Sequence, residues 1–353
     1  MKRWYLNVAC AIGAALLAPA SLSAATASTA SQRVTAAANA FLATLDDSQR
    51  QAVLFAFDDA NQRVRWSNLP VAIVPRAGIS LQQMNTAQRA AAMSLLSSAL
   101  SRSGFEKIQQ IMEGDEVNKA NSENNPNRRP RPPGQAGPLF GKDLYYFSIL
   151  GAPSEKEPWM LQFGGHHLAL NLTVAGERGV LTPTLTGAQP AIYTLNGKTV
   201  RPLKGESDKA IALLNSLDDQ QRSQAILNYR VANLVLGPGQ DGKTIQPEGL
   251  KASAMTASQR AVLLDLISEW AGIVHESAAA TRMAEIKAAL DDTWFAWSGP
   301  ASVAPGSNVT AYYRIQGPGL VIEYAPQGDD PAMHIHTMYR DPTNDYGRRL
   351  TAK

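Results

Sequence analysis

Apolar positions follow helical spacing in four short segments of the chain, and each segment begins with a capping pattern. At each start, Asp, Asn or Thr is followed three positions later by Gln. This spacing lets the two side chains satisfy free N–H groups in the first turn of a helix. The four pairs are Asp46 with Gln49, Asn85 with Gln88, Asp218 with Gln221, and Thr256 with Gln259. The pattern therefore predicts a helix after each pair, the last with an apolar stripe at 263, 266, 267, 270 and 274.

Runs rich in branched and aromatic residues come after the helical segments and are bounded by Gly and Pro, which predicts strands. The runs are residues 144–150 and 159–163 in the first half, and 293–297, 310–315 and 320–324 in the second. Each half thus passes from helices to antiparallel strands, which favours an α+β fold over alternating βαβ units. Between the two helical regions, the polar stretch 118–138 is crowded with Asn, Pro and Arg and predicts an exposed, mobile loop.

Two signatures occur twice, in the same order and at nearly the same separation. Residues 45–50 (LDDSQR) return as 217–222 (LDDQQR), 172 positions later. Gly78, Met84 and the pair 88–89 return as Gly249, Met255 and the pair 259–260, 171 positions later. A shared offset predicts an internal duplication, with a first repeat at 28–204 and a second at 205–353.

The first 27 residues differ in kind from the rest. Lys2 and Arg3 precede an apolar stretch from 4 to 17 and then a run of small residues, which is typical of a cleaved secretory signal. The mature chain is expected to start near residue 26 or 28 and to be secreted or periplasmic. No later run approaches the roughly 18 apolar residues of a membrane span, so we expect a soluble product with no membrane partner.

Charge and cysteine content exclude several classes of function. Without Lys2 and Arg3 the chain has 31 basic and 30 acidic residues, a balance that does not predict nucleic acid as a partner. The only cysteine, Cys10, lies in the signal, which excludes disulfides, cysteine–zinc sites and thiol nucleophiles from the mature protein.

Four of the five histidines form two tight pairs, and all four are candidate metal ligands: His166 with His167, and His334 with His336. Each pair follows a β segment of its half, so we expect the pairs at near-equivalent places. His334 and His336 point the same way if they lie in a strand. His167 is then the better candidate to join them, unless Gly164 and Gly165 form a bulge that redirects both members of the first pair.

The ligand types narrow the choice of ion. Three histidines and a water are common at catalytic zinc sites, whereas added carboxylates favour iron or manganese. A divalent metal ion, zinc first, is therefore the predicted cofactor. The alternative is that the four histidines are hydrogen-bonded interior residues or surface residues.

Acidic and basic residues gather near the second pair. Glu323 and Asp341 are candidate general bases, and Arg340 is a candidate for holding an anionic substrate by bidentate hydrogen bonds. Asp341 is equally a candidate to orient a ligating histidine. The competing interpretation is that residues 341–345 form an ordinary turn, since Asp, Pro and Asn are common turn residues.

Three segments resemble a family known as domain of unknown function 3500. They are residues 163–171 (FGGHHLALN), Thr182-Pro183-Thr184 with Gly187-Ala188, and residues 334–347 (HIHTMYRDPTNDYG). The resemblance covers nearly the whole mature chain. It implies a mostly secreted family and no particular activity.

Three hypotheses follow. The first is an exported metal-dependent enzyme, such as a hydrolase, acting on a small-molecule substrate through a histidine-rich site. The second is an extracytoplasmic protein that binds a small molecule or a metal without turnover. The third is a structural role in which the histidines hold the two halves together. The sequence carries no serine-hydrolase elbow, P-loop, His-Glu-x-x-His or dinucleotide motif, and it does not predict an oligomeric state.

Overall fold

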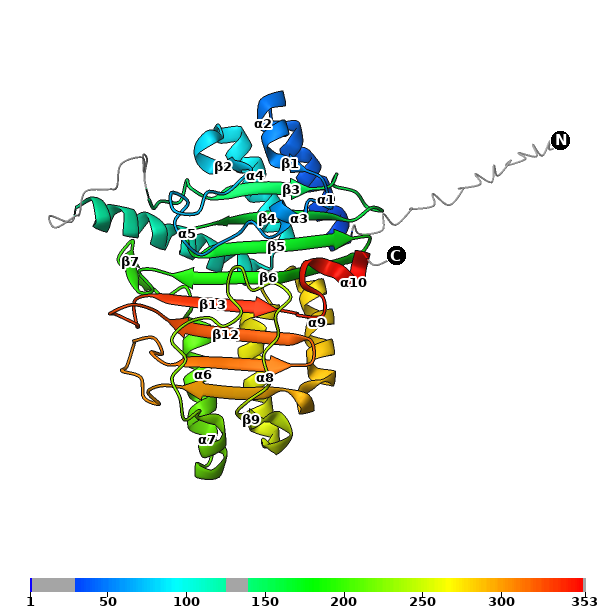
Figure 1. Ribbon diagram of the computed structural model, residues 1–353. Coiled ribbons are helices and arrows are strands. Elements are labelled where there is room, and N and C mark those ends of the chain that lie inside the picture. The colour runs from blue at the N-terminus through cyan, green and yellow to red at the C-terminus, as the bar shows by residue number, and fades with distance from the viewer. Residues whose placement is uncertain (2–28, 125–138, 352–353) are drawn as a thin grey trace.

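An eleven-stranded sheet runs through the part of the chain that the structure, a computed structural model, describes: residues 1, 29–124 and 139–351 (Figure 1). The strand order is β1-β3-β4-β5-β6-β13-β12-β11-β10-β9, with β2 paired to β3. Neighbouring strands are antiparallel except β1 and β3, which are parallel. The strands of the first half are β1 (Leu54–Phe55), β2 (Ile79–Ser80), β3 (Tyr146–Leu150), β4 (Trp159–Gly165), β5 (Leu168–Ala175) and β6 (Arg178–Ala188). Those of the second half are β9 (Leu250–Lys251), β10 (Trp294–Ser298), β11 (Tyr312–Gly317), β12 (Leu320–Pro326) and β13 (Ile335–Arg340). A separate hairpin consists of β7 (Tyr193–Leu195) and β8 (Lys198–Val200).

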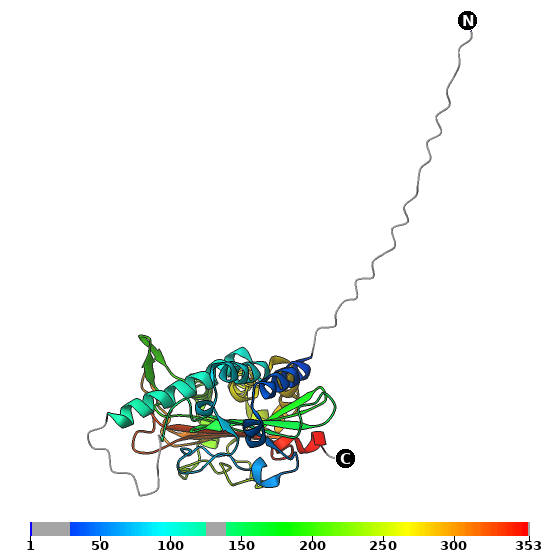
Figure 2. The same ribbon diagram turned by 90° about the horizontal axis from the view of Figure 1, so that it is seen from above.

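Most helices lie on one face of the sheet, as the view from above shows (Figure 2). All four predicted capping boxes are present, at the starts of α2, α4, α7 and α8. The helices are α1 (Ala30–Ala43), α2 (Asp47–Val53), α3 (Ala60–Arg63), α4 (Thr86–Ala99), α5 (Arg102–Glu123), α6 (Lys204–Ser216), α7 (Asp219–Ala225), α8 (Ala257–Ala271), α9 (Glu276–Ala288) and α10 (Arg348–Thr351). Short 3₁₀ turns lie at η1 (Leu81–Gln83), η2 (Ala252–Ala254), η3 (Leu290–Asp292) and η4 (Asp345–Gly347).

The two faces of the sheet bury different chemistry. On the face covered by helices, alternate strand residues such as Phe163 and Leu170 join α1 and α4 in one apolar core, and Tyr313 and Ile322 join α6 and α8 in a second. We call this the helix face. Because side chains alternate along a strand, the residues between them point to the opposite face.

The opposite face, the loop face, is covered by two irregular segments, residues 56–77 and 226–249 (Figure 1). Polar side chains from the strands hold these segments by their backbones. Gln162 donates to the backbone carbonyl of Arg63. Arg340 donates to the backbone carbonyl of Leu236, and the backbone N–H of Leu236 donates to the carboxylate of Glu323. Hydrogen bonds to the backbone therefore hold both covering segments, together with apolar contacts of Trp66 and Leu234.

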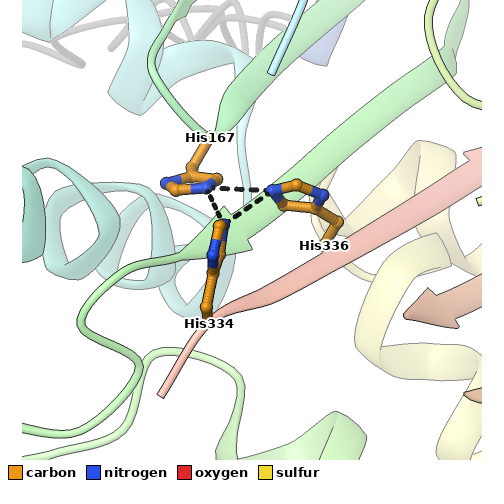
Figure 3. Close-up of side chains that lie close together, drawn as sticks. All are labelled: His167, His334 and His336. Atoms are coloured by element: carbon orange, nitrogen blue, oxygen red, sulfur yellow. Dashed lines mark hydrogen bonds between the residues drawn. The ribbon is translucent and has the colours of Figure 1, made fainter. Parts of the chain in front are cut away.

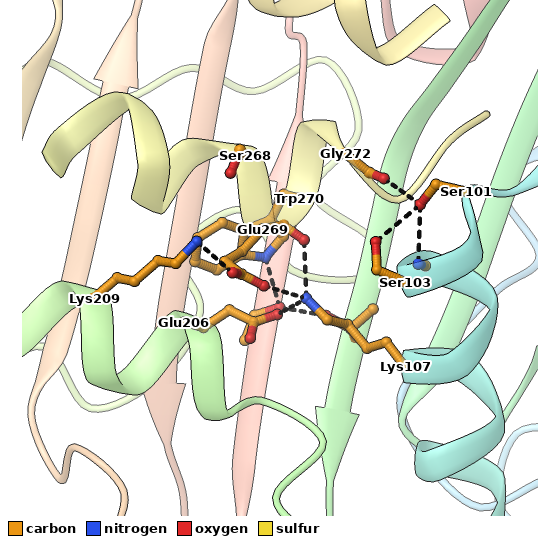
Figure 4. A network of polar contacts seen from close by, with 12 residues as sticks. Ser101, Ser103, Lys107, Glu206, Lys209, Ser268, Glu269, Trp270 and Gly272 are labelled. Atoms are coloured by element: carbon orange, nitrogen blue, oxygen red, sulfur yellow. Dashed lines mark hydrogen bonds and ion pairs between the residues drawn. The ribbon is translucent and has the colours of Figure 1, made fainter. Parts of the chain in front are cut away.

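The two halves meet where β6 pairs with β13. In this pair Thr186 lies opposite Thr337, and their hydroxyl oxygens are 2.7 Å apart. On the helix face Trp270 donates its indole N–H to Thr337, and nearby Lys107 of α5 forms ion pairs with Glu206 of α6 and Glu269 of α8 (Figure 4). The halves are thus joined by a continuous sheet and by a buried ionic cluster.

The α+β prediction is confirmed, and the order of helices followed by four long strands recurs in both halves. The prediction for residues 118–138 is wrong at its start, because α5 continues through Glu123. An ion pair between Lys119 and Glu116 spans one turn of that last part of the helix. Residues 125–138 and the predicted signal at 1–27 lie outside the described residues, apart from Met1. Among the described helices, none combines the length and apolar character needed to cross a bilayer.

Candidate metal centre

Three histidine rings meet at one point on the loop face (Figure 3). The Nε2 atom of His167 lies 2.9 Å from Nε2 of His334 and 3.0 Å from Nε2 of His336. The remaining pair, His334 and His336, has its Nε2 atoms 3.1 Å apart. The three atoms form a nearly equilateral triangle, with each ring pointing the same nitrogen inward.

Strand geometry explains how residues so distant in sequence converge. His336 in β13 pairs with Gly187 in β6, and Thr186 pairs with Leu168 at the start of β5. His167, one position before Leu168, is therefore in line with Gly187 and His336 across three neighbouring strands. His334 precedes His336 by two positions and so lies on the same side of the sheet.

Gly187 and the backbone of His167 make room for this arrangement. His167 ends the two-residue turn between β4 and β5 with a φ of 61°, in the left-handed region. A Cβ placed on Gly187 would lie 3.1 Å from Cδ2 of His167 and 2.8 Å from the carbonyl oxygen of Ile335. A side chain at position 187 would therefore force apart β6, the backbone at Ile335 between the other two histidines, and the His167 ring.

The environment keeps the three imidazoles neutral. His167 and His336 are buried and His334 is half-buried. Burial lowers the pKa of His334 to about 4 and that of His336 to about 3, and it lowers the pKa of His167 well below its usual range. A neutral imidazole nitrogen is the form that binds a metal ion.

Hydrogen bonding among the rings does not account for the triangle. A neutral imidazole carries one N–H, and that N–H lies in the ring plane and serves one acceptor well. A zinc ion bonded at about 2.0–2.1 Å in tetrahedral geometry holds its nitrogen ligands about 3.3–3.4 Å apart. The observed separations are within a few tenths of an ångström of that spacing, so the three nitrogens can hold one ion. Among the described residues, the group consists of the three histidines and includes no carboxylate.

Asn68, in the covering segment 56–77, contacts two of the three histidines. Its backbone carbonyl accepts the backbone N–H of His167 at 3.1 Å. Its side-chain amide nitrogen lies 3.3 Å from Nδ1 and 3.4 Å from Nε2 of His336. Sequence reasoning missed this residue, because an Asn in a Ser-Asn-Leu-Pro loop has no spacing that distinguishes it from any turn residue.

His166, predicted as a fourth ligand, points elsewhere. Its Nδ1 lies 2.6 Å from Oδ1 of Asp115 in α5, and its ring packs against that of His167 with centroids 3.8 Å apart. The expectation that the two pairs occupy equivalent places is also wrong. The first pair lies in the turn between the second and third long strands of its half, whereas the other lies at the start of the fourth long strand.

The three predicted catalytic residues form their described hydrogen bonds and ion pairs with groups other than the three histidines. Glu323 accepts hydrogen bonds from the N–H groups of Val235 and Leu236 and from the hydroxyl of Tyr312. Arg340 pairs with Asp241 and Asp345, and Asp341 caps the turn that follows β13. Arg340 and Asp341 lie four and five positions beyond His336 along an extended chain. Their catalytic roles stay predictions.

Comparison with known proteins gives a family and no activity. No curated protein and no solved structure matches the chain. A family model described as "Protein of unknown function (DUF3500)" matches residues 27–348, and this range contains the three histidines, Asn68 and Gly187. The chain belongs to this DUF3500 family, in agreement with the resemblance found in its motifs.

Proposed function

We propose that this protein is an exported metal-dependent enzyme, a hydrolase, that holds one zinc ion through His167, His334 and His336. The observation that carries the proposal is the triangle of three inward-facing Nε2 atoms within 3.1 Å of one another. Three protein ligands and an open position are typical of catalytic zinc, whereas structural zinc sites usually have four protein ligands. Zinc bound in this way supplies a Lewis acid that activates water at neutral pH.

The neighbourhood of the triangle supports chemistry on a small molecule. His334 is half-buried, whereas His167 and His336 are buried, so His334 is the member of the group that solvent reaches. Asn68 lies against His336 and can orient a polar ligand at the open position. Glu323 and Arg340 remain candidates for proton transfer and substrate binding only if the covering segments move. Asp341 also remains a candidate, but it pairs with Arg282 on the helix face.

Elemental analysis of the protein purified without a histidine tag tests the metal. We expect about one equivalent of a divalent ion, zinc first, and none in the His334→Ala/His336→Ala variant. His275 supplies the control, because it lies outside the triangle and its side chain caps α9. The His275→Asn variant keeps a capping side chain and should retain the metal. A native protein without stoichiometric metal would end the proposal.

A second candidate function is capture of a metal or a small molecule without turnover. It is favoured by the engagement of Glu323 and Asp341 in hydrogen bonds away from the triangle. A panel of esters, amides and phosphoesters distinguishes the two. Hydrolysis that is lost in the double variant and with a chelator, and restored by zinc, supports the enzyme. Stoichiometric metal without hydrolysis across the panel supports the binding protein.

We also propose export through the N-terminal signal. The family match begins at residue 27, next to the expected cleavage sites. N-terminal sequencing of the protein from the extracytoplasmic fraction is expected to begin near residue 26 or 28. An intact Met1 on the accumulated protein would contradict export by cleavage.

We propose further that residues 28–204 and 205–353 arose by duplication. Support comes from a detail repeated in both halves. Gln88 donates to Gln49 at 2.6 Å, and Gln259 donates to Gln221 at 2.7 Å. In each half the same side chain also donates to the carbonyl of the residue two before the first cap, at Thr44 and Ser216. A profile built from each half separately should detect the other half in further family members.

A further inference from the structure

A cavity of about 590 Å³ lies on the helix face where the two halves meet. We call it the seam cavity. Its walls come from α1, β5 and β6 of the first half and from α8, α9 and β13 of the second. Its size falls within the range of small-molecule sites, roughly 300–1,000 Å³. It is distinct from the histidine centre, because Tyr339 in its wall points to the opposite face of β13 from His336.

The inner walls are apolar. Val34, Leu172 and Leu181 contribute from the first half, and Trp270 and Val274 contribute from the second. Each of these side chains is more than nine-tenths buried, and Val274 of the second half packs in the apolar core of the first. The walls therefore favour an aliphatic or aromatic body over a sugar or a nucleotide, since burying unpaired hydroxyl or amide groups there costs free energy.

The polar groups of the cavity leave hydrogen-bond donors unused. Arg282 has five N–H donors, and its partners are Tyr339, Glu285, the Gly319 carbonyl and Asp341, so one donor remains. The hydroxyl of Thr182, which also lines the cavity, is buried and has no hydrogen-bond partner in the described structure.

Two further arginines line the rim. Within the described residues, the side chains of Arg178 and Arg349 form no ion pair. Of the three acidic residues that line the cavity, Glu285 and Asp341 pair with Arg282, and only Glu177 has no ion pair in the described part of the chain. The unused capacity is therefore mainly that of donors and positive charge. Such groups bind a carboxylate by charge-assisted hydrogen bonds.

We propose that the seam cavity binds an amphipathic organic acid, with its apolar chain between the walls and its carboxylate at Arg178, Arg349 and the free donor of Arg282. The site requires both halves, because neither half supplies both walls. Binding there is independent of the metal centre and of the function proposed for it.

Dodecanoate is the probe, and isothermal titration calorimetry is the measurement, on the full mature chain. We expect binding to the wild type and at least tenfold weaker binding of dodecanol, which keeps the chain and loses the charge. The Arg178→Ala/Arg349→Ala variant should bind dodecanoate at least tenfold more weakly. Arg230 is exposed and lies outside the cavity, so the Arg230→Ala variant is the matched control and should bind as wild type.

Two more variants locate the probe. Ala278→Phe introduces a ring from α9 into the cavity and should abolish binding while circular dichroism stays that of the wild type. His334→Ala/His336→Ala should bind dodecanoate as wild type does, because a carboxylate can also coordinate zinc and this variant removes that route. Absence of binding to the wild type, equal binding of dodecanol, or binding lost with the histidines would overturn the proposal. A misfolded Ala278→Phe variant leaves the surface arginine pair as the deciding test.

Discussion

The two polar clusters that connect the halves differ in what they leave unsatisfied. On the helix face, Lys107 lies 2.6 Å from a carboxylate oxygen of Glu206 and 3.0 Å from one of Glu269, so the protein supplies both signs of charge (Figure 4). Burial alone would lower the pKa of Lys107, but the two carboxylates raise it. On the loop face, three neutral imidazoles point at a common centre (Figure 3). The first cluster balances its charge within the chain, although one carboxylate oxygen of Glu206 is buried without a hydrogen-bond partner. The second cluster carries no charge of its own and could hold a metal ion.

This difference separates a structural cluster from a binding site more clearly than burial does. Both clusters are largely buried, and both bring together residues from the two halves. A buried charge must have its counter-ion in the fold, because removing one partner leaves the other charge without solvation. A set of neutral ligands carries no such penalty, so the protein can stay folded when these histidines hold no metal ion.

The largest effect is expected from breaking the ionic cluster. The Lys107→Met variant leaves the fully buried Glu206 carboxylate without its cation, and we expect a loss of about 3–5 kcal/mol in the free energy of unfolding, measured in urea. Lys142→Met is the control, because Lys142 pairs with Glu113 at the surface and contacts no member of the cluster, and its loss should cost about 1 kcal/mol or less. Metal content should not change in either variant. An unchanged urea midpoint in Lys107→Met would contradict a structural role for this cluster.

Withdrawal of the metal is expected to act on stability through mass action. At a free zinc concentration a thousand times the dissociation constant, binding stabilises the native state by about 4 kcal/mol. We therefore expect the urea midpoint of the wild type to fall when a chelator is added and to recover with zinc. The His334→Ala/His336→Ala variant should show the same midpoint in both conditions. Zinc that stabilises the variant as much as the wild type would place the ion elsewhere.

The sequence predicts local features of this fold well. Capping boxes depend on residues three positions apart, and each of the four predicted boxes forms. The common direction of His334 and His336 follows from strand alternation alone. The approach of His167 could be suspected from the scarcity of histidine, but its cause is the pairing of β6 with β13, which joins segments about 150 positions apart.

Proximity in sequence does not by itself place a residue beside the histidines. Asp341 is five positions from His336, but an extended chain rises by about 3.3 Å per residue, so the two are separated by roughly 16 Å along β13. Asn68 is about 270 positions away and touches the His336 ring. Contacts made by an irregular covering segment have no periodicity in the sequence, which is why this residue could not be predicted.

Gly187 offers a way to disturb the histidine centre without removing a ligand. The Gly187→Ala methyl group would lie 2.8 Å from the carbonyl oxygen of Ile335 and 3.1 Å from the His167 ring, so one or both must shift. We expect metal affinity to fall by about 100-fold, because ligands of a metal must be held to within a fraction of an ångström. Gly179 lies in the same strand, and a Cβ there would meet its nearest atoms at 3.7 and 3.9 Å. Competition titration with a zinc indicator should therefore show wild-type affinity for Gly179→Ala. Equal affinities for the two variants would contradict the close packing of His167 over β6.

The smallest effect is expected at Asn68, which touches the centre from outside the ligand set. When His336 binds the ion through Nε2, its Nδ1 carries the proton, and a half-turn of the Asn68 amide presents an oxygen acceptor to it. We expect Asn68→Ala to lower zinc affinity by about tenfold and Asn68→Asp to keep it, since a carboxylate accepts the same proton. Asn233, in the other covering segment, accepts the backbone N–H of its neighbour Leu234 and is the matched control for the alanine change. Equal zinc affinities of Asn68→Ala and Asn233→Ala would mean that the covering segment closes the site without orienting its ligands. The contrast between the charge-balanced cluster and the histidine centre would then rest on the three histidines alone.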